Sequence, residues 1–301
     1  MGRGFFRNTK TDRHFYGWRF IVSAAVLSCL LLVAGQPIAA ESHALYTDEA
    51  APDAAESPIS ERFPEKLEIP QCPTDTEDHE MRVLSGFTLC YRESYEQAEW
   101  VAYTITPEKL IKAAKRTDKF LADPEISTGS ATPDDYKGSG YDRGHLAPAG
   151  DMAYSAVTMK ESFFMSNMSP QNPSFNRGIW NSMEENVRSV AAKCDCLYIV
   201  TGPVLEKPAS EYASIGANEV SVPEFYYKVM LAVTYEDVQN AATVTAYAYL
   251  VPNGKSSEKI KKFLCSIDDV EARTGIDFFW LLDDELENML EAGTSTTIGL
   301  R

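Results

Sequence analysis

The sequence predicts an α+β domain built on a central, mainly antiparallel β-sheet that is flanked by helices. Two strands around a turn are predicted at residues 87–92 and 100–106, and segments rich in valine, tyrosine and alanine predict strands at 197–201, 224–235 and 242–251. Helical patterning predicts helices at residues 106–117, 158–163, 175–193, 256–264, 270–275 and 283–291. Strands that follow one another in runs, with helices inserted or appended, favour α+β over a parallel α/β fold.

The residues between these elements support the predicted boundaries. Residues 94–99 predict a turn between the first two strands. Thr106 suits the cap of the first helix, because Pro107 then occupies its first turn. Residues 122–140 are polar and contain three glycines, which predicts a long loop. We find no internal repeat.

Composition is that of a folded protein, with 44% hydrophobic and 24% charged residues among 301. The formal net charge of −16 argues against a nucleic-acid ligand, because phosphate binding needs lysine and arginine. The acidic residues concentrate in residues 47–80 and 268–291, whereas residues 109–188 are close to charge balance. Because net charge does not determine the field in a cleft, the charges of residues 109–188 have to be considered separately from those of the acidic segments.

Residues 1–40 have the order of a secretory signal peptide, with basic residues, an apolar run at 20–35 and then Ala39 and Ala40. This predicts an exported protein, periplasmic or extracellular. The alternative is an uncleaved segment that anchors the protein in a membrane, for which the run is short. Residues 41–66 predict a flexible acidic linker, because they are rich in Ala, Pro, Glu, Ser and Asp.

Five cysteines follow the N-terminal segment, and an exported protein can keep disulfides. Cys72 and Cys90 flank a predicted hairpin, so we expect them to pair. Either Cys194 or Cys196 could then pair with Cys265, which leaves one thiol over.

The stretch Asp142-Arg143-Gly144-His145 places an acid, a guanidinium, a glycine and an imidazole side by side. Hydrolysis of a phosphodiester needs a base for water, a cation for phosphate and positive charge at the leaving oxygen. His145 suits the base because imidazole titrates near neutrality, and Arg143 can bind phosphate through two parallel hydrogen bonds. The alternative is a surface turn in which Asp142 and Arg143 form an ion pair.

A second polar stretch runs from residue 166 to 188. Asn176, Trp180 and Glu184 lie four residues apart, so a regular helix places them on one face. The amide oxygen of Asn176 is a hard ligand that suits Mg²⁺, and Glu184 could hold a metal-bound water. The alternative is that Asn176 caps the helix, Trp180 packs in the core and Glu184 faces solvent. Ser174 is an equally suitable cap.

The two stretches together, DRGH followed by NMSPQ and Asn-x₃-Trp-x₃-Glu, resemble the DNA/RNA non-specific endonuclease family. This is the endonuclease-G-like group of ββα-metal, or His-Me finger, nucleases. The resemblance spans roughly residues 84–290 and includes TGPVL at 201–205, VPEFYYKV at 222–229 and TGIDFF at 274–279. It implies a nuclease domain over residues 67–301, whose sheet carries a ββα-metal finger as the active site.

The resemblance implies a role for each residue that matches the family pattern. His145 would be the general base that activates water. Asn176 would be the sole direct protein ligand of a hydrated Mg²⁺ ion, which Mn²⁺ could replace. Glu184 would orient metal-bound water. Asn167 would position His145 or the substrate.

Four charged residues complete the pattern. Arg143 would bind phosphate near the scissile bond, Asp142 would brace the loop, and Arg116 would stabilise the transition state. This chain has Arg177 where members of the family often have glutamine; the added cation would help to hold phosphate or point outward. We therefore expect nucleic acid to contact Arg143, Arg177 and Arg116.

The function implied is a Mg²⁺-dependent endonuclease that cuts DNA and RNA without sequence preference and leaves 5′-phosphates. A homodimer and an inhibitor protein are further partners that the sequence leaves open. Two alternatives remain: a related fold that binds nucleic acid or a protein without cutting, and a phosphatase- or sulfatase-like hydrolase. The joint presence of His145, Asn176 and Glu184 favours the nuclease, and the scarcity of histidine disfavours a two-metal site.

Overall fold

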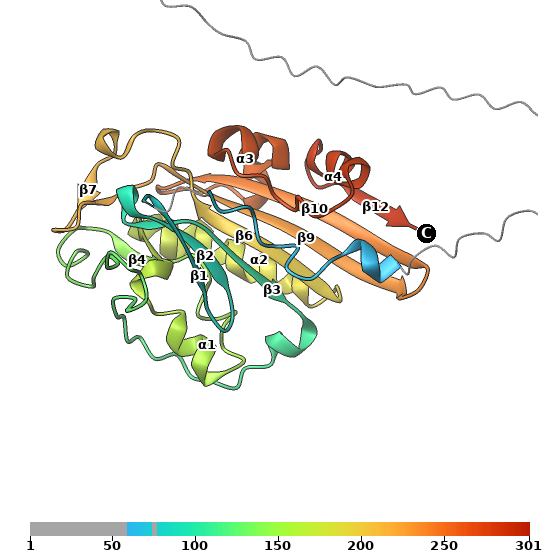
Figure 1. Ribbon diagram of the computed structural model, residues 1–301, viewed down its shortest axis with the longest axis horizontal. Helices are drawn as coiled ribbons and strands as arrows, with labels where there is room; N and C mark the ends of the chain where they lie inside the picture. The colour runs from blue at the N-terminus through green and yellow to red at the C-terminus, as the bar shows by residue number, and fades with distance from the viewer. Residues whose placement is uncertain (1–58, 74–76) are drawn as a thin grey trace, which may run out of the picture. The chain divides into compact units, whose positions relative to one another are not determined.

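A single antiparallel sheet organises the computed structural model, which describes residues 59–73 and 77–301. The sheet has eight strands in the order β1-β2-β3-β6-β9-β10-β11, and β12 also pairs with β10 (Figure 1). The strands are β1 His79–Val83, β2 Thr88–Arg92, β3 Gln97–Ile105, β6 Cys196–Pro203, β9 Phe225–Asp237, β10 Ala241–Pro252, β11 Leu264–Cys265 and β12 Thr297–Leu300. Every pairing in this sheet is antiparallel, which confirms the predicted α+β class.

Both faces of the sheet are covered. Along β9, Val229, Leu231 and Val233 pack into a core that includes apolar residues of α3 and α4, whereas Met230 and Ala232 pack with α2. This alternation is the period-two pattern of a strand. Figure 1 shows α3 and α4 along one face and α2 behind the sheet. The α-helices are α1 Ala156–Glu161, α2 Asn181–Ala191, α3 Ile267–Thr274 and α4 Asp284–Glu291.

A separate ββα unit carries the DRGH motif. Strand β4, Asp142–His145, pairs antiparallel with β5, Met168–Gln171, and the chain continues through a π-helical turn, Phe175–Trp180, into α2. Gly144 is required by this pairing, because an added Cβ would lie 2.1 Å from the Gln171 side chain. The glycine therefore makes room for the neighbouring strand. A second small hairpin joins β7, Ser214–Ile215, to β8, Val220–Ser221.

Two predicted helices are shorter than the sequence suggested. The helix expected at 106–117 is a 3₁₀ turn at Pro107–Leu110, because the amides of Ala113 and Ala114 bond instead to the carbonyl of Ala153. The helix expected at 256–264 is a 3₁₀ turn at Ile260–Phe263 that leads into β11, where pairing with β10 takes over. Strands β1, β7, β8 and β12 were not predicted either.

The packed domain begins before residue 67, where the linker was expected to end. Ile59–Arg62 forms a 3₁₀ turn, and Ile59 and Phe63 are buried in the core. These two apolar residues are too few to produce a periodic pattern in an otherwise polar stretch. Residues 1–58, which include the predicted signal or anchor segment and most of the linker, lie outside the described residues. Within residues 59–73 and 77–301, no helix has the length and apolarity needed to cross a bilayer.

The predicted disulfide between Cys72 and Cys90 is present. The second predicted bridge is not, because Cys194, Cys196 and Cys265 are free. Cys196 lies on β6 and Cys265 on β11, with β9 and β10 between them. Three strand spacings of about 4.8 Å exceed the ~7 Å that a disulfide can span between Cα atoms.

Candidate active site

A polar cleft of about 390 Å³ brings most of the predicted site residues together. Strand β4, the loop before it and the ββα helix each contribute side chains. Pro148, Ala149, Gly150 and Asn181 complete its wall. The predicted residues that line it are Arg116, Arg143, His145, Asn176, Arg177 and Glu184.

His145 ends β4 and is held by two aromatic rings. Its imidazole lies edge-on to Phe163, with ring centroids 4.9 Å apart, and 5.8 Å from the ring of Phe120. The residue is only 8% exposed, and its Nε2 has no hydrogen-bond partner among the described residues. Its burial and the two rings therefore fix the imidazole in place.

The surroundings of His145 keep it neutral. Burial lowers the pKa of the imidazole to about 3, with smaller contributions from the positive charges of Arg116 and Arg143. The side chain is consequently a proton acceptor throughout the physiological pH range.

This depressed pKa predicts an acid-sensitive fold. Protonation of His145 is harder in the folded state than in the unfolded state, so its contribution is complete above pH 6.5 and is lost as pH falls towards 3. We expect wild type to lose about 3 kcal/mol more than His145→Gln between pH 7 and pH 4. Urea unfolding at each pH measures the difference. Parallel pH profiles for the two proteins would contradict a buried neutral imidazole.

Asn167 braces the loop after His145 and does not line the cleft. Its amide is fully buried. Oδ1 accepts a hydrogen bond from the backbone N of Ala147 at 2.9 Å, and Nδ2 donates to the carbonyls of Ala147 and Ser162, each at 2.9 Å. Asn167 thus lies outside the lining of the cleft, and its role in positioning His145 stays a prediction.

Asn176 presents an oxygen that suits a cation. Its Nδ2 donates to the Asp142 carboxylate at 3.0 Å, so Oδ1 is the amide atom left for a ligand. Arg177 forms two further hydrogen bonds with Asp142, at 2.6 and 2.8 Å. Burial alone would raise the pKa of Asp142, but the bonds from Arg177 and Asn176 hold it below its ordinary value. A neutral oxygen beside an already neutralised carboxylate fits a single hydrated divalent ion.

Neither predicted helix cap operates. Ser174 makes no capping bond through its side chain; its own backbone N donates instead to Oδ1 of Asn172 at 2.9 Å. The helical spacing also breaks, because Gly178 has non-helical torsions within a π-helical turn. As a result Trp180 is buried against Phe175 rather than sharing the cleft with its neighbours four residues away. π-Helical turns often occur at functional sites for this reason.

Two of the three arginines that line the cleft stack on the rings that hold His145. The guanidinium of Arg143 lies 4.1 Å from the centroid of Phe120, and that of Arg116 lies 5.0 Å from Phe163. Arg116 also pairs with Asp118 at 2.6 Å. Phe120 and Phe163, which lie in no motif that the sequence analysis identified, therefore place two cations and the base in one cleft.

A buried group of charges lies behind Glu184. Asp151 accepts hydrogen bonds from Tyr103 at 3.0 Å and from Arg188 at 2.8 Å. Lys228 on β9 is fully buried; its Nζ has no hydrogen-bond partner among the described residues and lies 4.9 Å from the Trp180 ring.

The charges in this group depend on one another. Burial raises the pKa of Glu184, and Asp151 raises it further, whereas Lys228 lowers it. Burial lowers the pKa of Lys228, and Glu184 and Asp151 oppose that shift. Lys228 was not predicted, although a lysine within the apolar run of VPEFYYKV was a usable signal.

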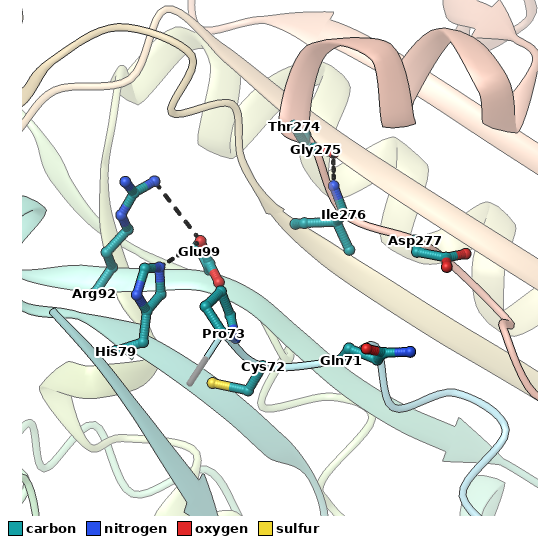
Figure 2. Close-up of a pocket in the computed structure, with 10 residues that line it drawn as sticks. All are labelled: Gln71, Cys72, Pro73, His79, Arg92, Glu99, Thr274, Gly275, Ile276 and Asp277. Carbon is teal, nitrogen blue, oxygen red and sulfur yellow. Dashed lines mark hydrogen bonds and ion pairs between the residues drawn. The ribbon is translucent and has the colours of Figure 1, made fainter. Parts of the chain in front are cut away.

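A larger cavity, of about 510 Å³, lies elsewhere and contains none of the predicted site residues. His79 and Arg92 both face Glu99 there, at 3.4 and 3.8 Å (Figure 2). The Glu99 carboxylate in this cavity is thus already paired with His79 and Arg92. The residues that line the cleft around His145, rather than its volume, identify it as the candidate active site.

The family model of the DNA/RNA non-specific endonucleases matches residues 64–285. The chain belongs to this family. The mitochondrial nuclease EXOG of Xenopus laevis is 33% identical over 277 residues, which cover 88% of this chain and 72% of that protein. The mitochondrial endonuclease G of Caenorhabditis elegans is 37% identical over 218 residues, covering 67% and 69%.

A solved structure of the EndoG/EndoGI complex, which concerns EndoG inhibition, is also similar. It matches with a TM-score of 0.61 and 30% identity, over 67% of this chain and 86% of that chain. The ββα-metal architecture expected from the resemblance is thereby confirmed. Members of this nuclease family generally depend on a divalent metal.

These relatives correct the predicted location. The EXOG and endonuclease G proteins of Xenopus laevis, Homo sapiens and Bos taurus are named as mitochondrial. The prediction of an exported protein, periplasmic or extracellular, is therefore wrong. That prediction depended on residues 1–40, where a basic segment followed by an apolar run does not by itself identify the compartment.

Proposed function

We propose that this member of the non-specific endonuclease family is a Mg²⁺-dependent endonuclease that cuts both DNA and RNA and leaves 5′-phosphates. The observation that carries the proposal is that a neutral His145 and the free amide oxygen of Asn176 line one cleft. A base and a cation ligand that share a cleft are what phosphodiester hydrolysis requires.

His145 takes the proton of the attacking water. The water oxygen then bonds to phosphorus, and the bond from phosphorus to the 3′ oxygen breaks. The phosphate stays on the 5′ oxygen of the downstream nucleotide. Burial and the nearby arginines keep the imidazole unprotonated before the reaction. A phosphate that enters the cleft brings negative charge, which stabilises the imidazolium as it forms.

Arg116 and Arg143 hold the phosphate beside His145. Both guanidinium groups are oriented by aromatic rings, so they lose less freedom when they bind. Arg177 differs because Asp142 holds its guanidinium through two hydrogen bonds, whereas Arg116 makes a single bond to the exposed Asp118. We therefore assign the phosphate contacts to the first two arginines, and to Arg177 the task of neutralising the acid behind Asn176.

Asn176 would hold the metal ion directly, and Glu184 would orient its water. When bound, the ion supplies positive charge to the leaving 3′ oxygen. Glu184 has to be ionised for this task. Lys228 favours the ionised form of Glu184, because it is a buried positive charge close enough to lower the pKa of the carboxyl.

The cleft offers little with which to read bases. Its wall consists of arginines, small residues and two asparagines besides His145 and Glu184. Contacts to phosphate carry no sequence information, which supports cutting of either polymer at many sites. Because Arg116 and Arg143 displace counterions when they bind phosphate, binding should weaken as salt rises. A homodimer and an inhibitor protein remain predictions for this chain.

The direct test is to incubate the full chain with supercoiled plasmid and with single-stranded RNA, in Mg²⁺, Mn²⁺ or EDTA. We expect both polymers to be cut in either metal and neither in EDTA, with 5′ ends that a ligase accepts without prior phosphorylation. Cleavage of one polymer alone would contradict indifference to the sugar. Binding without cleavage in every metal would favour the alternative of a non-cutting binding module.

A further inference from the structure

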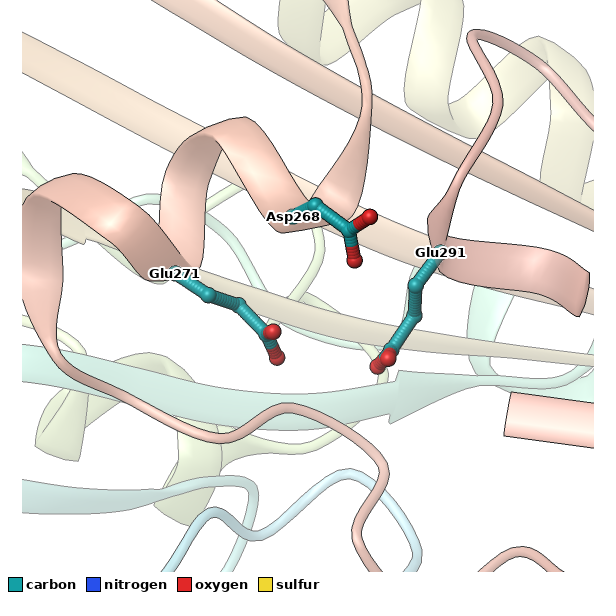
Figure 3. Close-up of side chains that lie close together, drawn as sticks. All are labelled: Asp268, Glu271 and Glu291. Atoms are coloured by element: carbon teal, nitrogen blue, oxygen red, sulfur yellow. The ribbon is translucent and has the colours of Figure 1, made fainter. Parts of the chain in front are cut away.

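A cluster of carboxylates joins α3 to α4 on the face of the sheet opposite α2. Asp268 and Glu271 lie on α3, and Glu291 is the last residue of α4. One oxygen from each of the three lies within 4.8 Å of the others. Figure 3 shows the three side chains converging from the two helices. Three like charges at this separation repel one another unless something neutralises them.

Glu291 is the member that most needs a partner. Glu291 is only 8% exposed, and its Oε1 has no hydrogen-bond partner among the described residues. It sits at the C-terminal end of a helix, where the helix dipole disfavours negative charge. Burial raises the pKa of Glu291 to about 9, with further contributions from Glu271, Glu287 and Asp268.

The described residues around the cluster leave no unpaired basic side chain on α3. Arg273, the one basic residue of α3, pairs with Glu206 at 2.5 Å. Within the described part of the chain, no salt bridge involves Asp268, Glu271 or Glu291. Glu271 accepts one bond, from the backbone N of Phe278 at 2.9 Å. The cluster is therefore an all-oxygen site that no lysine or arginine of the described residues pairs with.

We propose that Asp268, Glu271 and Glu291 bind a calcium ion that clamps α3 to α4. Calcium takes six to eight oxygen ligands in flexible geometry and accepts carboxylates through one or both oxygens. Magnesium prefers to keep its waters and takes fewer carboxylates, and zinc prefers nitrogen and sulfur ligands. This site is independent of the cleft, because α3 and α4 pack on the opposite face of the sheet from α2.

The test is thermal unfolding of the full chain with and without Ca²⁺, for wild type and for variants. We expect Ca²⁺ at about 100 times its dissociation constant to raise the Tm of wild type by roughly 5 °C or more. Asn176→Ala, which removes the cleft ligand, should show the same rise. Glu285→Gln, an exposed change of charge on α4, should also keep it. Glu291→Gln and Asp268→Asn should lose it.

Each outcome decides the proposal. A rise in Tm that persists in Glu291→Gln and Asp268→Asn would place the ion elsewhere and overturn it. So would a wild type that does not respond to Ca²⁺, since the cluster would then be neutralised by protons. If Glu291→Gln does not fold, calorimetric titration of the milder Asp268→Asn decides: wild type should bind one more calcium ion than this variant.

Discussion

Asn176→Ala will lower the rate of plasmid cleavage at saturating substrate by roughly 10³-fold or more. The amide oxygen of Asn176 is the one we assign to the metal ion, and loss of several kcal/mol of charge stabilisation corresponds to a factor of that size. Single-turnover cleavage over a range of Mg²⁺ concentrations measures the effect. Part of the lost rate should return at high Mg²⁺, because the cleft keeps its other polar groups.

Asn181→Ala is the matched control for this variant. Asn181 lines the same cleft, but its amide donates to Glu185 at 3.2 Å and is exposed. Its removal should change the rate less than about fivefold, because no reacting atom depends on it. Equal losses in the two variants would mean that any asparagine in the cleft serves, and would contradict the assignment of the metal ligand.

Lys228→Met will destabilise the protein by about 3 kcal/mol at pH 7. Lys228 is the buried positive charge that opposes the upward pKa shift of Glu184, so its loss leaves Glu184 and Asp151 with less compensation. Glu184 will then be more protonated at neutral pH, and cleavage will need a higher pH than in wild type. Urea unfolding and the pH dependence of the cleavage rate measure the two effects.

Lys255→Met provides the comparison, because Lys255 is exposed and the change in charge is the same. We expect it to alter the free energy of unfolding by less than about 0.5 kcal/mol and to leave the pH profile in place. If Lys228→Met is as stable as Lys255→Met, the ammonium group does not balance the buried carboxylates. The role given to it beside Glu184 would then fail.

The long strands could be predicted from sequence because their alternation is visible along the chain. Residues of β9 such as Met230 and Leu231 face opposite cores, as a period of two requires. The helix expected after Thr106 could not be corrected in this way. It ends early because Ala113 and Ala114 bond to Ala153, and a partner some forty residues away leaves no local signal.

The site residues also separate into those that local motifs predict and those that depend on distant parts of the fold. His145, Asn176 and Glu184 could be found because they lie in two short motifs, and the fold brings them into one cleft. The π-helical turn was invisible in the sequence, so Trp180 was wrongly placed on their face. Lys228 lies on another strand, and its position behind Glu184 depends on the register of the whole sheet.

The central claim is that His145 is the base. The most direct test compares wild type with His145→Gln in single-turnover cleavage of plasmid at saturating Mg²⁺, with DNA affinity and Tm measured on the same preparations. The account predicts a rate lower by about 10²- to 10⁴-fold, with DNA affinity and Tm at neutral pH nearly unchanged. Cleavage by correctly folded His145→Gln at the wild-type rate would contradict it.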